Sequence, residues 1–139
     1  LKLVRQVRDF TIVHATLDTP SGWGYVTNKF DALASFSYQY TPLCFFGHTH
    51  TPVFYSKSLS VGVEEGLKVE IEQGKKYFTN VGSVGQPRDG DPRASYCIYD
   101  MGGQRMINRR VDYDLKAAQG KIRDAGLPEM LAERLELGK

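Results

Sequence analysis

The sequence has few cysteines, almost no surplus charge and no long hydrophobic run, and each absence excludes a class of protein. Two cysteines in 139 residues do not make a disulfide scaffold, and we expect Cys44 and Cys97 to be buried, reduced thiols. The 18 lysines and arginines nearly balance 16 aspartates and glutamates, so charge gives no basis for binding nucleic acid. No apolar stretch approaches the roughly 20 residues of a membrane span. We therefore expect a soluble, cytoplasmic protein.

The apolar residues are numerous enough for the core of one domain, at 41% of the chain. In the first part of the chain, their spacing predicts a strand over Phe10–Val13, a helix over 28–39 and a strand over 42–46. A parallel crossover is the natural interpretation of strand, helix, strand. The sequence therefore predicts a mixed α/β fold.

Beyond residue 50 the apolar period changes to two, which predicts further strands, among them one over Tyr77–Val81. Met101-Gly102-Gly103 predicts the turn of a hairpin between Ala94–Asp100 and Arg105–Val111. From Asp114 onward the spacing is again helical, with one helix that ends near Gly126 and a second that begins at Pro128.

The chain has only three histidines, and all three follow short apolar strands. His14 ends the first strand, and Gly47-His48-Thr49-His50 follows the strand over 42–46. A lone histidine after a strand is more often a satisfied core or loop residue, but imidazoles at two strand ends favour a metal site. Three imidazoles could form a lone zinc site, whereas a dinuclear site would also need carboxylates, and no acidic cluster lies beside them in the sequence.

Two further regions have both a structural and a functional interpretation. The glycines and prolines between Asn80 and Arg93 fit tight turns of a structural loop, but Arg88 or Arg93 could instead meet a phosphate oxygen with the guanidinium fork. Trp23 and Tyr25 could cap the core or line the mouth of a substrate site. Both alternatives stay open in each region.

The histidine motifs resemble those of the calcineurin-like metallophosphoesterases. Gly47-His48-Thr49-His50 matches the last signature of that family, and Val13-His14 is similar to the signature before it, although Ala15 stands where the family usually has glycine. Asn80-Val81-Gly82-Ser83 is similar to the Asn-x-Gly-Ser loop of the family. Three such motifs in the family's order make the resemblance specific.

This resemblance implies a four-layer αββα sandwich with two divalent metal ions (Mn, Fe, Zn, Ni or Co) at the strand ends. His14 and His48 would bind one ion and His50 the other, with Arg88, Arg93 and Trp23 as candidate substrate-binding residues. The implied activity is hydrolysis of a phosphomonoester or phosphodiester. A second copy of the same chain also stays open as a partner, which would make the protein a homo-oligomer.

Three other family motifs, Asp-x-His, Gly-Asp-x-x-Asp and Gly-Asn-His, have no counterpart in the sequence. We therefore expect residues 1–139 to be the C-terminal part of a single domain whose N-terminal part is absent from the chain, and to be inactive alone. We also expect the strands near His14 and His48 to lie in a sheet whose other members are upstream. The alternatives are a non-catalytic interaction scaffold with this fold and a small mononuclear zinc protein complete in itself.

Overall fold

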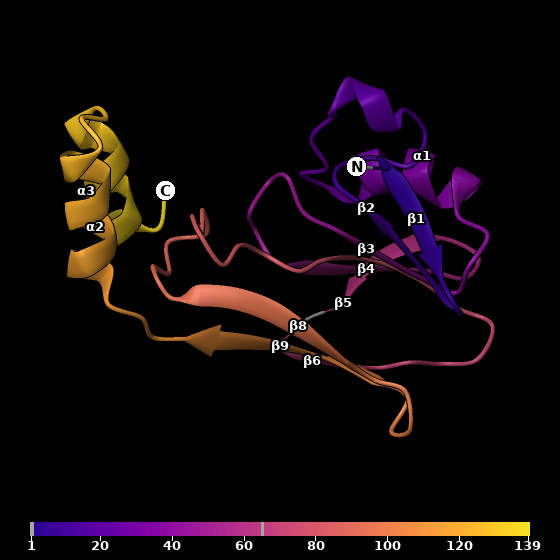
Figure 1. Cartoon of the computed structure of the whole chain (residues 1–139). Coiled ribbons are helices and arrows are strands. Elements are labelled where there is room, and N and C mark those ends of the chain that lie inside the picture. The colour runs from indigo at the N-terminus through magenta and orange to yellow at the C-terminus, as the bar shows by residue number, and fades with distance from the viewer. Residues whose placement is uncertain (1, 65) are drawn as a thin grey trace.

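The computed structural model describes residues 2–64 and 66–139, which form two β-sheets, three α-helices and one short 3₁₀ turn (Figure 1). The larger sheet has six strands in the order β1-β2-β3-β7-β4-β5. Their bounds are β1 Val4–Val7, β2 Phe10–Val13, β3 Leu43–Phe46, β7 Lys76–Asn80, β4 Val53–Lys57 and β5 Val61–Glu64. The smaller sheet has the order β6-β9-β8, with β6 Lys68–Glu70, β9 Arg105–Val111 and β8 Ala94–Asp100.

The centre of the larger sheet is parallel, and this part positions the histidines. Strand β3 pairs in parallel with β2 and β7, so that Leu43 lies opposite both Phe10 and Tyr77. Carboxyl ends of parallel strands meet at one edge of a sheet, and the segments that follow β2 and β3 therefore emerge side by side. The predicted parallel crossover between these strands is confirmed.

Helix α1 (Lys29–Tyr38) makes that crossover and covers one face of the larger sheet (Figure 1). It begins where the side chain of Asn28 accepts hydrogen bonds from the backbone N–H groups of Phe30 (2.8 Å) and Asp31 (3.1 Å). Phe36 is buried among residues of the sheet, and its ring centroid lies 6.0 Å from that of Phe78. Burial of this apolar face holds the helix to the sheet.

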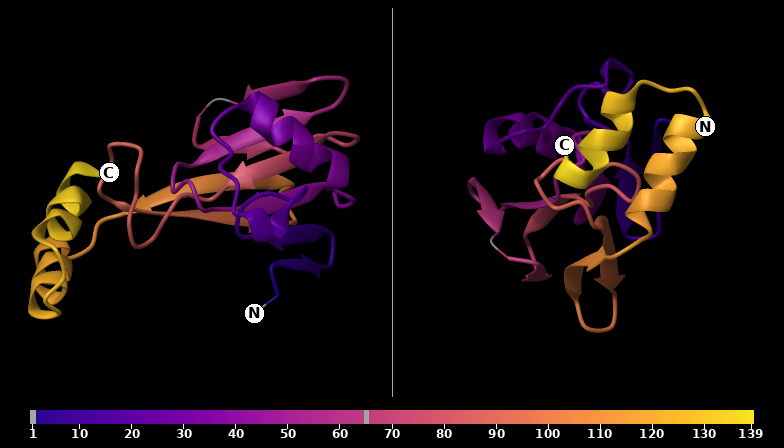
Figure 2. Two further views of the ribbon diagram at one scale, coloured as in Figure 1. Left: turned by 90° about the horizontal axis from the view of Figure 1, so that it is seen from above. Right: turned by 90° about the vertical axis from the view of Figure 1, so that its left-hand side faces the viewer.

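The smaller sheet packs on the other face, so that the layers run helix, sheet, sheet (Figure 2). The core between the sheets contains Leu43 and Tyr77 from the larger sheet and Met106, which is completely buried, from β9. The predicted hairpin is present as the antiparallel pair β8–β9. A mixed α/β sandwich is the result.

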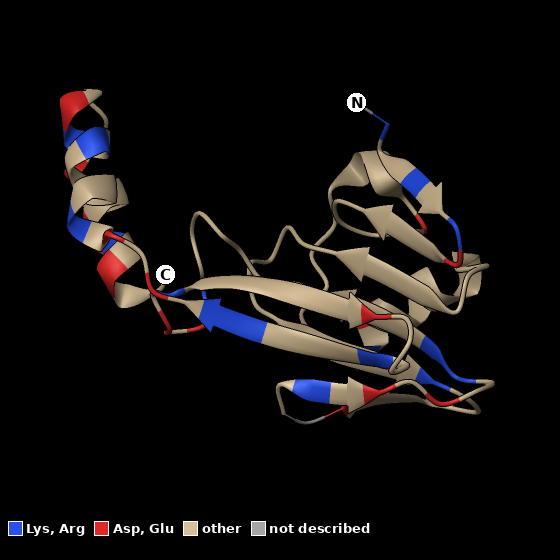
Figure 3. Cartoon of the chain, turned by 60° about the horizontal axis from the view of Figure 1, so that its bottom comes forward, with Lys and Arg blue, Asp and Glu red and all other residues tan. Residues whose placement is uncertain are grey.

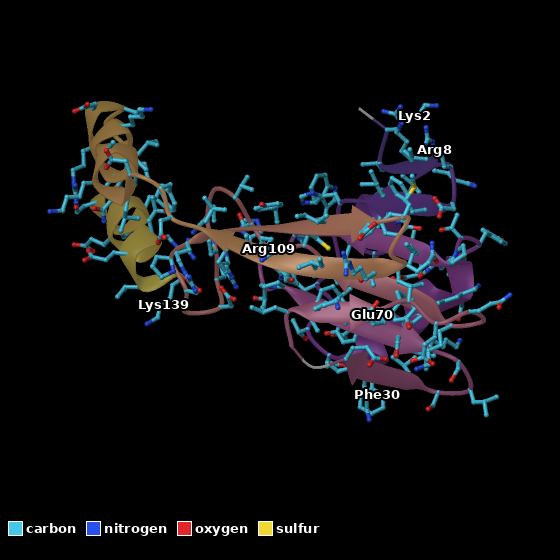
Figure 4. The ribbon with its side chains drawn as sticks, turned by 90° about the horizontal axis from the view of Figure 1, so that it is seen from below. Lys2, Arg8, Phe30, Glu70, Arg109 and Lys139 are labelled. Atoms are coloured by element: carbon cyan, nitrogen blue, oxygen red, sulfur yellow. The ribbon has the colours of Figure 1, made fainter. Side chains whose placement is uncertain are left out.

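The tail forms a helical hairpin of α2 (Leu115–Asp124) and α3 (Glu129–Leu137), which lies beyond the end of β9 and away from the sheets (Figures 1 and 2). The side chain of Asp114 caps α2 by accepting a hydrogen bond from Ala117 N, and Pro128 precedes α3 as predicted. Side chains drawn in Figure 4 place Lys139 beside this hairpin and Lys2 with Arg8 at the opposite end of the molecule.

One expectation is wrong: β2 and β3 do not depend on strands from elsewhere for their neighbours. Strands β1 and β7, both from the described residues, pair with their outer edges. The short strands β1 and β5 carry too few alternating residues to be recognised from the pattern. Within residues 2–64 and 66–139, no helix is both long and apolar enough to cross a membrane.

Candidate metal centre

His14 and His48 lie in contact at the edge of the sheet where β2 and β3 end. Gly47 N donates a hydrogen bond to His14 O (3.0 Å), which joins the two loops directly beyond the strands. The Nε2 atom of His14 and the Nδ1 atom of His48 are 3.0 Å apart. The structure thus brings together two imidazoles that lie far apart in the sequence.

The loop that carries His48 and His50 has an uncommon backbone conformation. His48 has a φ of +65° and His50 a φ of +60°, in the left-handed region that non-glycine residues rarely adopt. Such conformations persist where the surroundings over-determine them. Here the two left-handed residues flank Thr49 in a tight turn closed by a hydrogen bond from Thr49 N to Gly47 O (2.8 Å).

Asn80, at the end of β7, holds this turn in place through its side-chain hydrogen bonds, which we call the Asn80 clamp. Its side-chain amide donates hydrogen bonds to Gly47 O (2.9 Å) and Thr49 Oγ1 (2.6 Å), and its Oδ1 atom accepts one from Gly82 N (2.9 Å). Asn80 is 1% exposed, so water cannot replace these partners. The Asn-x-Gly-Ser loop and the Gly-His-x-His loop are therefore one hydrogen-bonded unit.

His50 is oriented by a different group. Its Nδ1 atom lies 2.8 Å from Gln86 O. A carbonyl oxygen can only accept, so Nδ1 carries the hydrogen and Nε2 is left with a free lone pair. Metal-binding histidines commonly have this arrangement, in which the second nitrogen donates to a carbonyl group.

The electrostatic surroundings favour the neutral, metal-binding form of two of the imidazoles. Partial desolvation lowers the pKa of His14, and the neighbouring His48 and His50 lower it further. Desolvation also lowers the pKa of His50, with contributions from the charges of Arg88 and Arg134, while the hydrogen bond to Gln86 acts in the opposite direction. Because a proton and a metal compete for the same nitrogen, these shifts favour metal binding at neutral pH.

The distance between His14 and His48 fits ligands of one ion. Two nitrogens that each bind a zinc-like ion at about 2.0–2.1 Å lie about 2.9–3.4 Å apart, depending on the angle at the ion. Among residues 2–64 and 66–139, however, no three histidine, cysteine, aspartate or glutamate side chains gather closely enough to hold a metal. The described residues thus bring two candidate ligands together without a third beside them.

Trp23 lies against the histidine pair, as its candidate role requires. Its ring centroid is 4.7 Å from that of His14 and 5.7 Å from that of His48, and the ring of Tyr25 lies tilted against His48 with 4.5 Å between the centroids. Trp23 is 49% exposed and borders a groove of about 500 Å³ that also contacts Ile12 and Phe45. The two aromatic rings do not cap the core.

The two candidate arginines of the loop, Arg88 and Arg93, have different surroundings. Arg88 N donates to His50 O (3.2 Å), and its Nε atom is buried without a hydrogen-bond partner among the described residues. Arg93 is exposed, and its guanidinium forms a fork with Asp91 through Nε (3.0 Å) and Nη2 (2.7 Å). Arg88 therefore adjoins the candidate metal centre, whereas the donors of Arg93 already have a partner.

Sequence reasoning missed Gln86, which orients His50, and Arg134, whose charge reaches it from α3. Gln86 contacts His50 through its backbone oxygen, and every residue type has such an oxygen. The position of Arg134 depends on how the helical hairpin meets the loop. No short-range signal could have identified either residue.

Comparisons with known proteins agree on the fold. Over its whole length the chain matches the crystal structure of a metallophosphoesterase from Sphaerobacter thermophilus, with a TM-score of 0.89 and 39% identity, and covers 60% of that structure. It also matches the hypothetical protein PH1004 from Pyrococcus horikoshii, with a TM-score of 0.67 and 16% identity, over 94% of this chain and 46% of that one. At that identity the second match supports the fold alone.

Among curated proteins, the uncharacterized protein MJ0912 of Methanocaldococcus jannaschii is 42% identical over 126 residues, which are 91% of this chain and 50% of that protein. The chain thus spans about half the length of its curated relative. No protein-family model matches the sequence.

Proposed function

The chain has the fold of a calcineurin-like metallophosphoesterase, and from this we propose that it is the C-terminal part of an enzyme that hydrolyses phosphomonoesters or phosphodiesters at a dinuclear metal site. The observation that carries the proposal is the 3.0 Å contact between His14 and His48 at the ends of adjacent parallel strands. A structural role would not require an exposed and a half-buried imidazole to meet there.

Each residue of the site has a role in this proposal. His14 and His48 hold one ion, and His50 holds the second through its free Nε2 atom. When bound, such ions activate water near neutral pH and offset charge on the phosphoryl oxygens. Arg88 donates a hydrogen bond to a phosphate oxygen from its Nε–H, which has no partner among the described residues, and Trp23 excludes water from one side of the site.

The ligand count supports the proposed division of the domain. Three histidines cannot fill the coordination positions of two ions, and the described residues offer no further ligand group. The curated relative is about twice as long as the matched segment. We therefore assign the bridging carboxylate and the remaining ligands to residues outside the chain, within the same domain.

The experiment uses the complete protein with His48→Ala and His50→Ala variants. Each variant should lose about one metal ion per chain, measured by elemental analysis, and should hydrolyse a chromogenic phosphodiester and a phosphomonoester at least about 100-fold more slowly, because one cation supplies several kcal/mol of charge stabilisation. Thr51→Ala, directly after the motif and exposed, is the matched control and should keep wild-type values.

Either variant with full metal content and wild-type turnover would refute the ligand assignment. A wild-type protein that binds two ions but hydrolyses neither ester would instead support the interaction scaffold.

A further inference from the structure

The helical hairpin α2–α3 has an interior of its own but little packing against the rest of the protein. Ala132 and Leu135 of α3 are buried, and Gln119 Nε2 of α2 donates to Ala132 O (2.9 Å). The hairpin is tied to the body through the loop after β7, where Gly90 N donates to Gly138 O (3.0 Å). Neither helix lies on a sheet (Figures 1 and 2).

Helices of this length need additional packing. α2 has 10 residues and α3 has 9, and isolated helices shorter than about 12–15 residues are marginal in water. Yet large apolar side chains of the hairpin face solvent: Leu127 is 50% exposed, Met130 63% and Leu137 54%. Met130 and Leu137 are two helical turns apart and therefore share one face of α3. This face therefore presents two apolar side chains, with the charged Glu133 and Arg134 between them.

The two helices carry opposite charge. α2 has three basic side chains and one acidic, a net charge of +2, whereas α3 has three acidic and one basic, a net charge of −2. Figure 3 shows both signs along the hairpin. One pair, Arg123 with Glu129, is satisfied inside the hairpin (2.6 Å). Among the described residues, Lys116, Lys121, Glu133 and Glu136 form no ion pair.

We propose that the hairpin binds the same hairpin of a second copy of this chain, related by a twofold axis, with α2 of each copy against α3 of the other. A twofold contact requires a self-complementary surface, and one basic and one acidic helix side by side provide it. The result is a four-helix arrangement that buries Met130 and Leu137 from both copies. A uniformly acidic or basic partner would match only one of the two helices.

The test measures the mass of the complete protein by light scattering and sedimentation, with charge reversals that spare the Arg123–Glu129 pair. The α2 reversal is Lys116→Glu with Lys121→Glu, and the α3 reversal is Glu133→Lys with Glu136→Lys. The wild-type protein should be a dimer, and either reversal should weaken dimerisation at least about tenfold. High salt should weaken the wild-type dimer in the same direction.

Restoration separates this contact from simple damage to the helices. An equimolar mixture of the two reversal variants should form heterodimers, and a chain carrying both reversals should form homodimers again, because the charges are then complementary in exchanged positions. Lys29→Glu with Lys68→Glu, on exposed positions of α1 and β6, is the control and should leave the dimer unchanged. Circular dichroism checks that each variant keeps its helices.

A wild-type protein that is monomeric at every concentration would overturn the proposal, since another segment or partner would then cover this face. Reversals without effect on the mass, or a double reversal that stays monomeric with its helices intact, would overturn it as well.

Discussion

Replacing Asn80 by alanine should damage both the stability of the protein and its affinity for metal, because this side chain connects the two loops of the candidate site. Three hydrogen bonds are lost. The buried Gly82 N–H loses its acceptor, at a cost of about 1–3 kcal/mol. Gly47 O keeps its bond from Thr49 N, so that the bonds to Gly47 and Thr49 cost only about 0.5–1.5 kcal/mol each.

The expected loss of unfolding free energy is therefore about 2–6 kcal/mol, which corresponds to a fall of roughly 10 °C in the unfolding midpoint. Released from its clamp, the turn that holds His48 and His50 left-handed loses its fixed geometry. Removal of such an orienting group typically lowers metal affinity about 10- to 100-fold. Calorimetric titration of the complete protein with Mn²⁺ or Zn²⁺, beside thermal unfolding of the metal-free form, measures both effects.

Asn108→Ala is the matched control. Asn108 is also buried, at 4% exposure, and accepts a hydrogen bond from Ser95 Oγ (3.0 Å), but it lies on β9 in the smaller sheet. This variant should lose stability and keep its metal affinity. If Asn80→Ala binds metal as tightly as the wild type while unfolding no more easily than Asn108→Ala, the clamp has no role in the site.

Four further substitutions test the loop after β7. Gly82→Ala should cost at least about 2 kcal/mol in urea unfolding, because φ is +78° and the new Cβ would lie 2.6 Å from Ser95 Cβ; wild-type stability would contradict this. Arg88→Lys should raise KM or lower kcat for phosphate esters by loss of the fork, whereas Arg93→Lys should do so only if Arg93 leaves Asp91 to bind substrate. The hydrogen-bonded guanidinium of Arg93 lowers the pKa of Asp91 to about 2. Its stabilising effect is present above about pH 4 and is lost as the pH falls towards 2, so Asp91→Asn should flatten the acid unfolding curve in that range and leave it unchanged at neutral pH.

The sequence allows the central strands, the crossover helix and the tail helices to be predicted, because each has a local apolar period. Strands β1 and β5 cannot be predicted from the sequence, because their own residues show no clear period and they form by pairing with β2 and β4. The pairing of His14 with His48 follows from two apolar strands that are each followed closely by a histidine. The Asn80 clamp and the orientation of His50 do not follow, because they depend on the path of loops and on backbone atoms that every residue type shares.

Gln86 belongs at once to the candidate metal centre and to the foot of the helical hairpin. Its backbone oxygen accepts from His50, while its side chain donates to Lys139 O (3.1 Å). A rearrangement of the hairpin would therefore change the position of the acceptor that holds the imidazole. Thermodynamic reciprocity then requires that a metal ion on His50 favour one hairpin arrangement by the same free energy with which that arrangement favours the ion. If the hairpin is a dimer contact, metal affinity should vary with protein concentration.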